Sequence, residues 1–117
     1  MAGTWNKQLP EELKKRLAEI QQIIKAGKLS EAENELRRLL EQEEFPELYN
    51  ALGYVMMQKG EHDAAVEEYK KGLKLNEKAA YILSNLSFAY VKLKKYKKAE
   101  ESLRKAIKIE EKFEYYD

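Results

Sequence analysis

The sequence contains no cysteine and only two prolines among its 117 residues. The missing cysteines exclude disulfides, thiolate catalysis and cysteine-ligated zinc, and they are typical of a reducing compartment. No stretch approaches the ~20 apolar residues that a membrane-spanning helix needs, and residues 1–9 lack the pattern of a signal peptide. We therefore expect a cytoplasmic protein that is not embedded in a membrane.

The composition that is present is typical of a soluble folded protein. Hydrophobic residues make up 44% of the chain and charged residues 37%, which indicates a packed core under a heavily charged surface. A chain of this length buries a modest core without disulfides or metals. We expect one domain over residues 1–117.

Charge is distributed unevenly along the chain, although the net charge is only +1. Residues 29–47 hold seven glutamates and two arginines, a net charge of −5. Residues 92–108 hold eight basic and two acidic residues, a net charge of +6. This asymmetry favours an oriented encounter with a charged partner, or head-to-tail contact between copies.

Hydrophobic periodicity indicates helices and no strands. Apolar residues recur at steps of three and four, as in Leu13, Leu17, Ile20 and Ile24, which is the period of a helix face. The pattern breaks at residues 27–28, 44–46, 60 and 76. These four breaks, together with a turn expected at the lysine run of residues 92–98, predict six helices, paired into three hairpins.

Local signals predict where some helices begin. Pro10 and Pro46 are placed as first-turn prolines, where the missing N–H costs no hydrogen bond. Ser30 and Glu33 form a Ser-x-x-Glu sequence, which predicts a capping box at the start of the second helix.

The chain repeats itself internally. A shift of 34 residues superposes similar residues, among them Leu52 on Leu86, Tyr54 on Phe88, Ala65 on Ala99, Tyr69 on Leu103 and Leu73 on Ile107. A shift of 33 in the other direction superposes Gly27 on Gly60, Ala32 on Ala65, Leu36 on Tyr69 and Leu40 on Leu73. The chain is therefore three copies of one helical hairpin.

A 34-residue unit of two antiparallel helices resembles the tetratricopeptide repeat family. The middle copy carries the family's pattern in Tyr49, Leu52, Gly53, Gly60, Ala65, Tyr69, Gly72 and Leu73. The last copy carries it in Leu83, Leu86, Ser87, Tyr90, Ala99, Leu103, Ala106 and Ile107. The first copy keeps only its second half, in Gly27, Ala32, Leu36 and Leu40, and Glu77 and Glu111 replace the family's terminal proline.

The resemblance implies an all-α, right-handed α-solenoid of three antiparallel hairpins, with repeats at about 10–44, 46–79 and 80–113. Small residues at positions 53, 65, 72, 99 and 106 let helices approach closely, while Tyr69 and Leu103 fill the space beside them. One hairpin cannot bury its apolar face alone, so each copy depends on its neighbours.

In this family the first helix of each repeat lines a concave groove, which implies a protein or peptide partner. The implied groove residues are Glu47, Asn50, Tyr54, Met57 and Gln58 in the middle copy, and Tyr81, Ser84, Asn85, Phe88, Val91 and Lys92 in the last. Tyrosine, phenylalanine and methionine there suit a helix or extended peptide with apolar anchors. The alternative is that these side chains pack between helices.

Some family members clamp the C-terminal carboxylate of a chaperone tail with lysine, asparagine and arginine side chains. The corresponding positions here hold Leu17, Gln21, Ala51, Tyr81 and Asn85. Because the basic residues of the clamp are missing, we do not expect a receptor of that kind.

Two further features carry a weaker signal. A lysine run at 92, 94, 95, 97 and 98 could meet phosphates, anionic lipid or an acidic peptide, or it is a solvated turn. We expect no nucleic-acid partner, because no nucleic-acid motif accompanies the run. The single histidine, His62, is expected at the surface of a turn.

Nothing in the sequence supports catalysis or a cofactor. His62 lacks a second ligand or nucleophile partner, and the paired glutamates at 67–68 and 100–101 are expected on outer helix faces as solubilising charge. The five glycines are scattered singly, so none forms a phosphate-binding loop. We expect no enzymatic activity, no metal and no cofactor.

The two ends leave a second function open. Trp5 could cover the first hairpin, while Phe113, Tyr115 and Tyr116 are either a packed cap or an exposed edge that self-associates. The alternative to a peptide-binding module is therefore a structural protein that forms a homodimer or filament through its terminal faces. A third alternative is an engineered repeat scaffold without a natural ligand.

Overall fold

The computed structural model describes the backbone of residues 7–116 and the side chains of residues 7–112. Over these residues the chain forms helices and no strand. The helices are α1 (Glu11–Lys25), α2 (Leu29–Gln42), α3 (Pro46–Gln58), α4 (His62–Leu75), α5 (Ala80–Lys92) and α6 (Tyr96–Tyr116). The predicted all-α architecture is confirmed, and the helix breaks fall where periodicity placed them.

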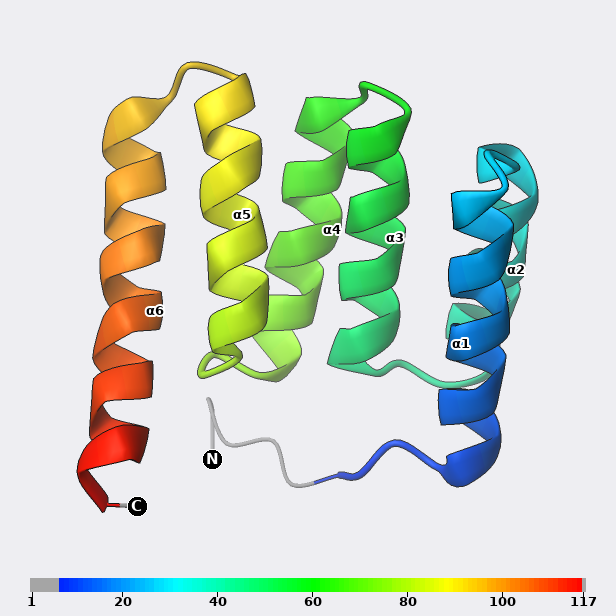
Figure 1. Cartoon of the computed structure of the whole chain (residues 1–117), viewed down its shortest axis with the longest axis horizontal. Helices are drawn as coiled ribbons and strands as arrows, with labels where there is room; N and C mark the ends of the chain where they lie inside the picture. Colours follow the sequence, from blue (N-terminus) through cyan, green and yellow to red (C-terminus); the bar gives the residue numbers. More distant parts are fainter. Residues whose placement is uncertain (1–6, 117) are drawn as a thin grey trace.

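The helices stack side by side as antiparallel hairpins, with α3 against α4 and α5 against α6 (Figure 1). The hairpins meet where α2 contacts α3 and where α4 contacts α5. Ion pairs reinforce the first boundary: Lys59 at the end of α3 lies 2.8 Å from Glu33 of α2. The fold is a helical repeat solenoid, in which each hairpin is stabilised by the next.

The predicted signals at helix starts are partly wrong. Ser30 is the second residue of α2, whose N-cap is Lys28 with no side-chain cap hydrogen bond, so the capping box does not form. Pro10 is the N-cap of α1 and precedes its first turn, whereas Pro46 begins α3 as predicted. The bend at Gly27 leads straight into α2 at Leu29, which leaves Ser30 inside the helix.

Each hairpin bends through the same backbone motif. The second residue after each first helix has a positive φ: 82° at Gly27, 81° at Gly60 and 62° at Lys94. The flanking amides then bond backwards, as where Glu61 N–H donates to Met56 O at 2.9 Å. This is the Schellman arrangement, which glycine favours because a β-carbon is strained at positive φ.

Lys94 occupies a position that the other two hairpins give to glycine, so we expect Lys94→Gly to stabilise the protein. The substitution removes the strain of a non-glycine residue at positive φ, but it also raises the conformational entropy of the unfolded chain. The net gain in the free energy of unfolding is about 0.5–1 kcal/mol. Urea denaturation followed by circular dichroism measures it. Lys94→Ala removes the same charge without relieving the backbone, and an equal gain in that variant would contradict the backbone explanation.

The core is continuous along the stack and depends on small residues at helix crossings. A β-carbon built on Gly53 would lie 2.4 Å from Cε1 of Tyr69, and one on Gly72 would lie 2.9 Å from Cδ1 of Ile82. Gly53 therefore admits the Tyr69 ring within the α3–α4 hairpin. Gly72 leaves room for the Ile82 side chain of α5 across the boundary between two repeats. Both contacts agree with the prediction that small residues let the helices approach closely.

The last helix differs from the prediction. Leu103 was expected to fill space between helices, yet Leu103 and Ile107, one turn further along, are 45% and 46% exposed. Their equivalents in α4, Tyr69 and Leu73, are buried and half-buried. The reason is that α5 covers α4, while no further helix among the described residues covers α6.

Two single-residue predictions are also wrong. Glu68 was expected on an outer face, but it is only 7% exposed, with one oxygen 3.4 Å from Lys71 Nζ and the other buried without a partner. His62 is the half-buried first residue of α4, with Nδ1 buried, and not a surface turn residue.

The predicted roles of Trp5, Phe113, Tyr115 and Tyr116 concern side chains outside the described residues. None of the helices that the structure describes is long and apolar enough to cross a membrane.

Candidate functional site

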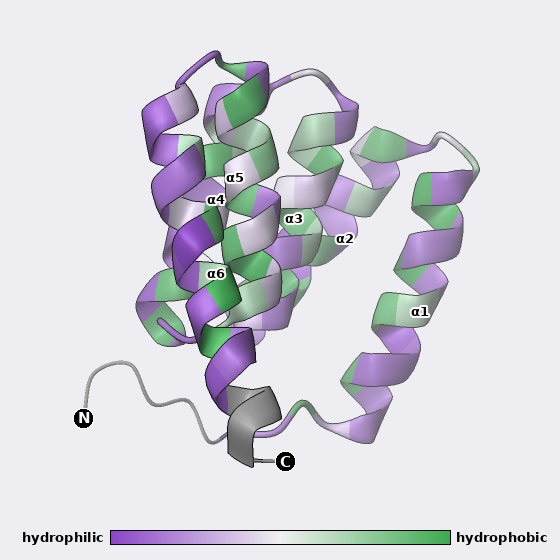
Figure 2. Cartoon of the chain, turned by 60° about the vertical axis from the view of Figure 1, so that its left-hand side comes forward, coloured by the Kyte–Doolittle hydropathy of each residue, from purple (hydrophilic) through white to green (hydrophobic). Residues whose placement is uncertain are grey.

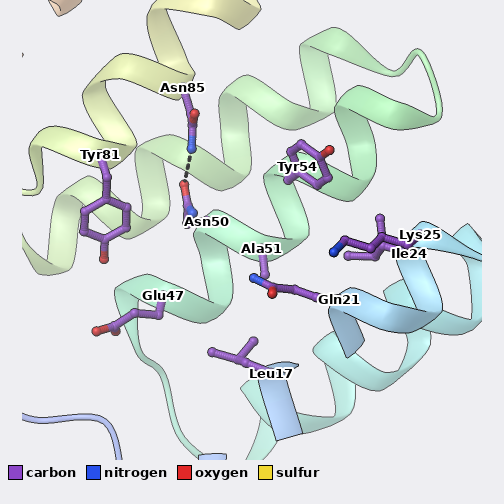
Figure 3. A pocket seen from close by; sticks show the side chains of 10 residues that line it. All are labelled: Leu17, Gln21, Ile24, Lys25, Glu47, Asn50, Ala51, Tyr54, Tyr81 and Asn85. Atoms are coloured by element: carbon purple, nitrogen blue, oxygen red, sulfur yellow. Dashed lines mark hydrogen bonds between the residues drawn. The ribbon is translucent and has the colours of Figure 1, made fainter. Parts of the chain in front are cut away.

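A groove of about 530 Å³ runs across the first helices of the three hairpins (Figure 3). Helix α1 contributes four residues, α3 four and α5 two. They are Leu17, Gln21, Ile24, Lys25, Glu47, Asn50, Ala51, Tyr54, Tyr81 and Asn85. These three helices lie on the same side of the stack, because each is the first helix of its hairpin and the hairpins repeat in one orientation.

An amide pair lies between α3 and α5 in this groove. Asn85 Nδ2 donates a hydrogen bond to Asn50 Oδ1 at 2.8 Å, across the boundary between two repeats (Figure 3). The bond leaves the amide nitrogen of Asn50 and the amide oxygen of Asn85 with further hydrogen-bonding capacity. The groove can therefore both donate to and accept from a polar ligand.

Two tyrosines give the groove its aromatic surface. Tyr54 is 47% exposed and Tyr81 is 43% exposed, so neither ring is committed to the core. Burial, and then the nearby Glu47 carboxylate, raises the pKa of Tyr81 to about 12. Tyr81 therefore keeps its hydroxyl proton at neutral pH and can donate a hydrogen bond.

Opposite charges stand at opposite sides of the groove. Glu47 lies near Tyr81 on one side, and Lys25 lies beside Ile24 on the other (Figure 3). The Oε1 atom of Glu47 is buried and has no hydrogen-bond partner. Because the residue also lines the groove, the rest of its carboxylate can accept a hydrogen bond from a ligand donor.

The structure gathers five of the predicted groove residues in this groove: Glu47, Asn50, Tyr54, Tyr81 and Asn85. Met57 is half-buried and packs against the core. Ser84, Phe88 and Lys92 are exposed along α5 beyond the groove lining, with Lys92 Nζ 5.3 Å from the centre of the Phe88 ring. Gln58 and Val91 are exposed as well.

Sequence reasoning placed only part of α1. Leu17 and Gln21 were assigned to positions of the carboxylate clamp, whereas Ile24 and Lys25, which also line the groove, were not predicted because the first copy has lost the family's Leu-Gly signature. A signal was present in the spacing of Leu17, Gln21 and Ile24, which share one helix face. The five positions that correspond to the carboxylate clamp all line the groove, although without the clamp's basic residues.

A smaller crevice of about 280 Å³ lies between α2, α3 and α4 and includes Glu68, Lys71 and Tyr49. The Tyr49 hydroxyl donates to Glu44, and burial followed by that carboxylate raises the pKa of Tyr49 to about 12. Among the residues that the structure describes, no three His, Cys, Asp or Glu side chains are grouped as metal ligands. The larger groove is therefore the stronger candidate site.

Family models match the second and third hairpins. A model described as "TPR repeat" matches residues 53–94, and one described as "Tetratricopeptide repeat" matches residues 80–113. The chain belongs to the tetratricopeptide repeat family. The first hairpin of this tetratricopeptide repeat protein lies outside both matches, in agreement with its degenerate opening helix.

A curated relative covers part of the tetratricopeptide repeat chain. BBSome complex member BBS4 of Bos taurus is 40% identical over 50 residues, which is 43% of this chain. The match spans only 10% of the relative, so it concerns a repeat segment and not the whole protein.

Solved structures share the tetratricopeptide repeat fold. MamA is similar with a TM-score of 0.78 and 24% identity, over 83% of this chain and 57% of MamA. PcrH in complex with the chaperone binding region of PopD is similar with a TM-score of 0.75 and 18% identity, over 88% of this chain and 79% of the PcrH chain. PcrH in complex with the chaperone binding region of PopB is similar with a TM-score of 0.76 and 18% identity, over 89% of this chain and 86% of the PcrH chain. At these identities the likeness concerns the fold.

Proposed function

We propose that this protein is a protein-interaction module that binds a peptide or protein segment in the groove across α1, α3 and α5. The observation that carries the proposal is the groove itself, which combines half-exposed tyrosine rings with a hydrogen-bonded asparagine pair. Aromatic rings supply apolar contact at low entropic cost. The amides supply the hydrogen bonds that a peptide main chain needs.

The comparisons support a polypeptide ligand. PcrH, which has the same fold, is described in complex with the chaperone binding regions of PopD and PopB. A concave surface built from repeated hairpins suits an elongated ligand, because each repeat adds contact area along one direction. The exposed Phe88 and Lys92 would extend the contact along α5.

Truncating the groove tyrosines should weaken binding without unfolding the chain. We expect Tyr54→Ala and Tyr81→Ala each to lower affinity for peptides selected from a random-sequence display library by about tenfold or more. Both rings are about half exposed, so helicity should be preserved. Fluorescence polarisation measures affinity and circular dichroism measures helicity.

Tyr96→Ala is the matched control, because Tyr96 is an exposed aromatic residue at the start of α6 outside the groove. Equal loss of binding in all three variants would contradict a groove site. Phe88→Ala should weaken binding only if the bound segment continues along α5.

A second candidate function is self-association through the outer face of α6. Exposed Leu103 and Ile107 form an apolar strip on this helix, and Figure 2 shows hydrophobic bands between hydrophilic ones on its outward side. At the other end, Lys15, Glu19 and Gln22 are exposed on α1 where α3 has buried Leu48, Leu52 and Val55. The polar and charged outer face of α1 would not pack well against the apolar strip of α6. The strip therefore favours contact between the α6 helices of two copies.

Light scattering over a range of concentration and salt tests this second function. We expect a dimer at high concentration, and Leu103→Glu should return it to a monomer because a charge then replaces one of the two apolar side chains of the strip. Lys105→Glu, which changes an exposed position of the same helix, controls for added charge. Growth beyond a dimer would instead indicate head-to-tail assembly, and a monomer throughout would exclude this function.

A further inference from the structure

We infer that the segment bound in the groove carries a basic side chain, arginine in preference to lysine, that pairs with Glu47 against the ring of Tyr81. The inference rests on the proposed function, because it names the chemistry of the ligand at that same groove. It arises from a half-buried carboxylate that lines the groove and has no ion-pair partner among the described residues.

Glu47 differs from the other half-buried glutamates of the acidic segment. Glu33 accepts hydrogen bonds from Lys59 and Arg37 at 2.8 and 2.9 Å, and Glu35 accepts from Arg16 and Arg38. These partners lower the pKa of both carboxyls. Among the described residues, Glu47 has no such partner, and its Oε1 is buried.

A role in stabilising α3 does not account for this arrangement. Glu47 is in the first turn of the helix, where a negative charge is favourable. However, α3 has no side-chain cap hydrogen bond, so the carboxylate is not held on the helix end. The Glu47 side chain lines the groove instead, and because only its Oε1 is a buried atom without a partner, a ligand donor would pair with the carboxylate from the Oε2 side.

The surroundings of Glu47 favour a guanidinium group. Tyr81 stands beside it with its ring half exposed, and the two interact electrostatically (Figure 3). A guanidinium carries several N–H donors in one plane, so it can donate to a carboxylate and stack on an aromatic face at the same time. An ammonium group satisfies the charge without the planar fit, which is why arginine is preferred over lysine.

The far side of the groove fixes the direction of the ligand. Lys25 stands there (Figure 3), so a basic side chain at that side meets a like charge. The basic residue of the segment is thus placed at the Glu47 side, where the groove is bounded by α3 and α5.

The test is a random-sequence peptide library panned against the whole chain, with Glu47→Gln panned in parallel. We expect arginine or lysine to be enriched at one aligned position by the native chain, and that enrichment to vanish with Glu47→Gln. Selected peptides should lose about tenfold or more in affinity for the variant. Glu101→Gln removes an exposed carboxylate on α6 and should leave selection and affinity unchanged.

Charge reversal makes the test two-sided. Glu47→Arg should enrich aspartate or glutamate at the position where the native chain enriched arginine. Enriched peptides without a basic residue, or a basic preference that survives Glu47→Gln, would overturn the inference while leaving the groove function intact. If the native chain enriches no peptide family at all, the proposed function fails and the inference fails with it.

Discussion

Gly53→Ala should lower the free energy of unfolding by about 1–3 kcal/mol, even though alanine is the better helix former by about 1 kcal/mol. The new β-carbon would lie 2.4 Å from Cε1 and 2.7 Å from Cδ1 of Tyr69. That ring is 1% exposed, so it cannot move aside without disturbing the core. Urea denaturation followed by circular dichroism measures the loss.

A second substitution should rescue the first. The last hairpin has Ser87 and Leu103 at the positions of Gly53 and Tyr69 in the middle one. There the fold accepts a β-carbon at the glycine position, because leucine replaces the larger tyrosine. We expect Gly53→Ala to cost much less in a Tyr69→Leu background. A double-mutant cycle with no coupling between the two sites would show that Tyr69 is not what excludes the methyl group.

Ala99→Leu should also destabilise the protein by about 1–3 kcal/mol. Helices α5 and α6 meet at this residue, since Ser87 Oγ donates a hydrogen bond to Ala99 O at 2.9 Å. Ala99 is buried, so three further carbon atoms have no space. The same urea titration measures this loss.

Glu101→Leu is the matched control for that substitution. Glu101 is on the same helix but exposed, so leucine there should change stability by no more than about 0.5 kcal/mol. An Ala99→Leu variant as stable as the native chain would contradict the close crossing between α5 and α6.

Periodicity was enough to predict the helices, because six amphipathic segments separated by turn residues have few alternative packings. Local capping signals were less informative. Ser30 looked like an N-cap, but a Schellman bend at Gly27 determines where α2 begins. The burial of Glu68 was not visible either, because a charged residue at that spacing is ordinarily solvated and only the tertiary contact reveals otherwise.

Five of the predicted groove residues, all in the second and third hairpins, line the observed groove, whereas two of the α1 residues that line it were not predicted. Tyr54, Tyr81 and their neighbours carry the repeat pattern, which projects them to one face. The α1 residues Ile24 and Lys25 carry no such pattern, and their place depends on how the first hairpin packs against α3. The absence of a partner for Glu47 is partly visible in the sequence, because residues 39–58 contain no lysine or arginine. The fold adds to it, because Lys59 pairs with Glu33.

The Asn50–Asn85 bond joins helices of different repeats, so this part of the groove crosses the boundary between two repeats and does not lie within one hairpin. A ligand that bonds to both amides holds the two repeats at a fixed angle. Binding and curvature are then thermodynamically linked. If the ligand favours one curvature of the stack over another by some factor, that curvature binds the ligand more tightly by the same factor. Tension applied to the ends of the protein would therefore act on ligand release at a distance from the groove.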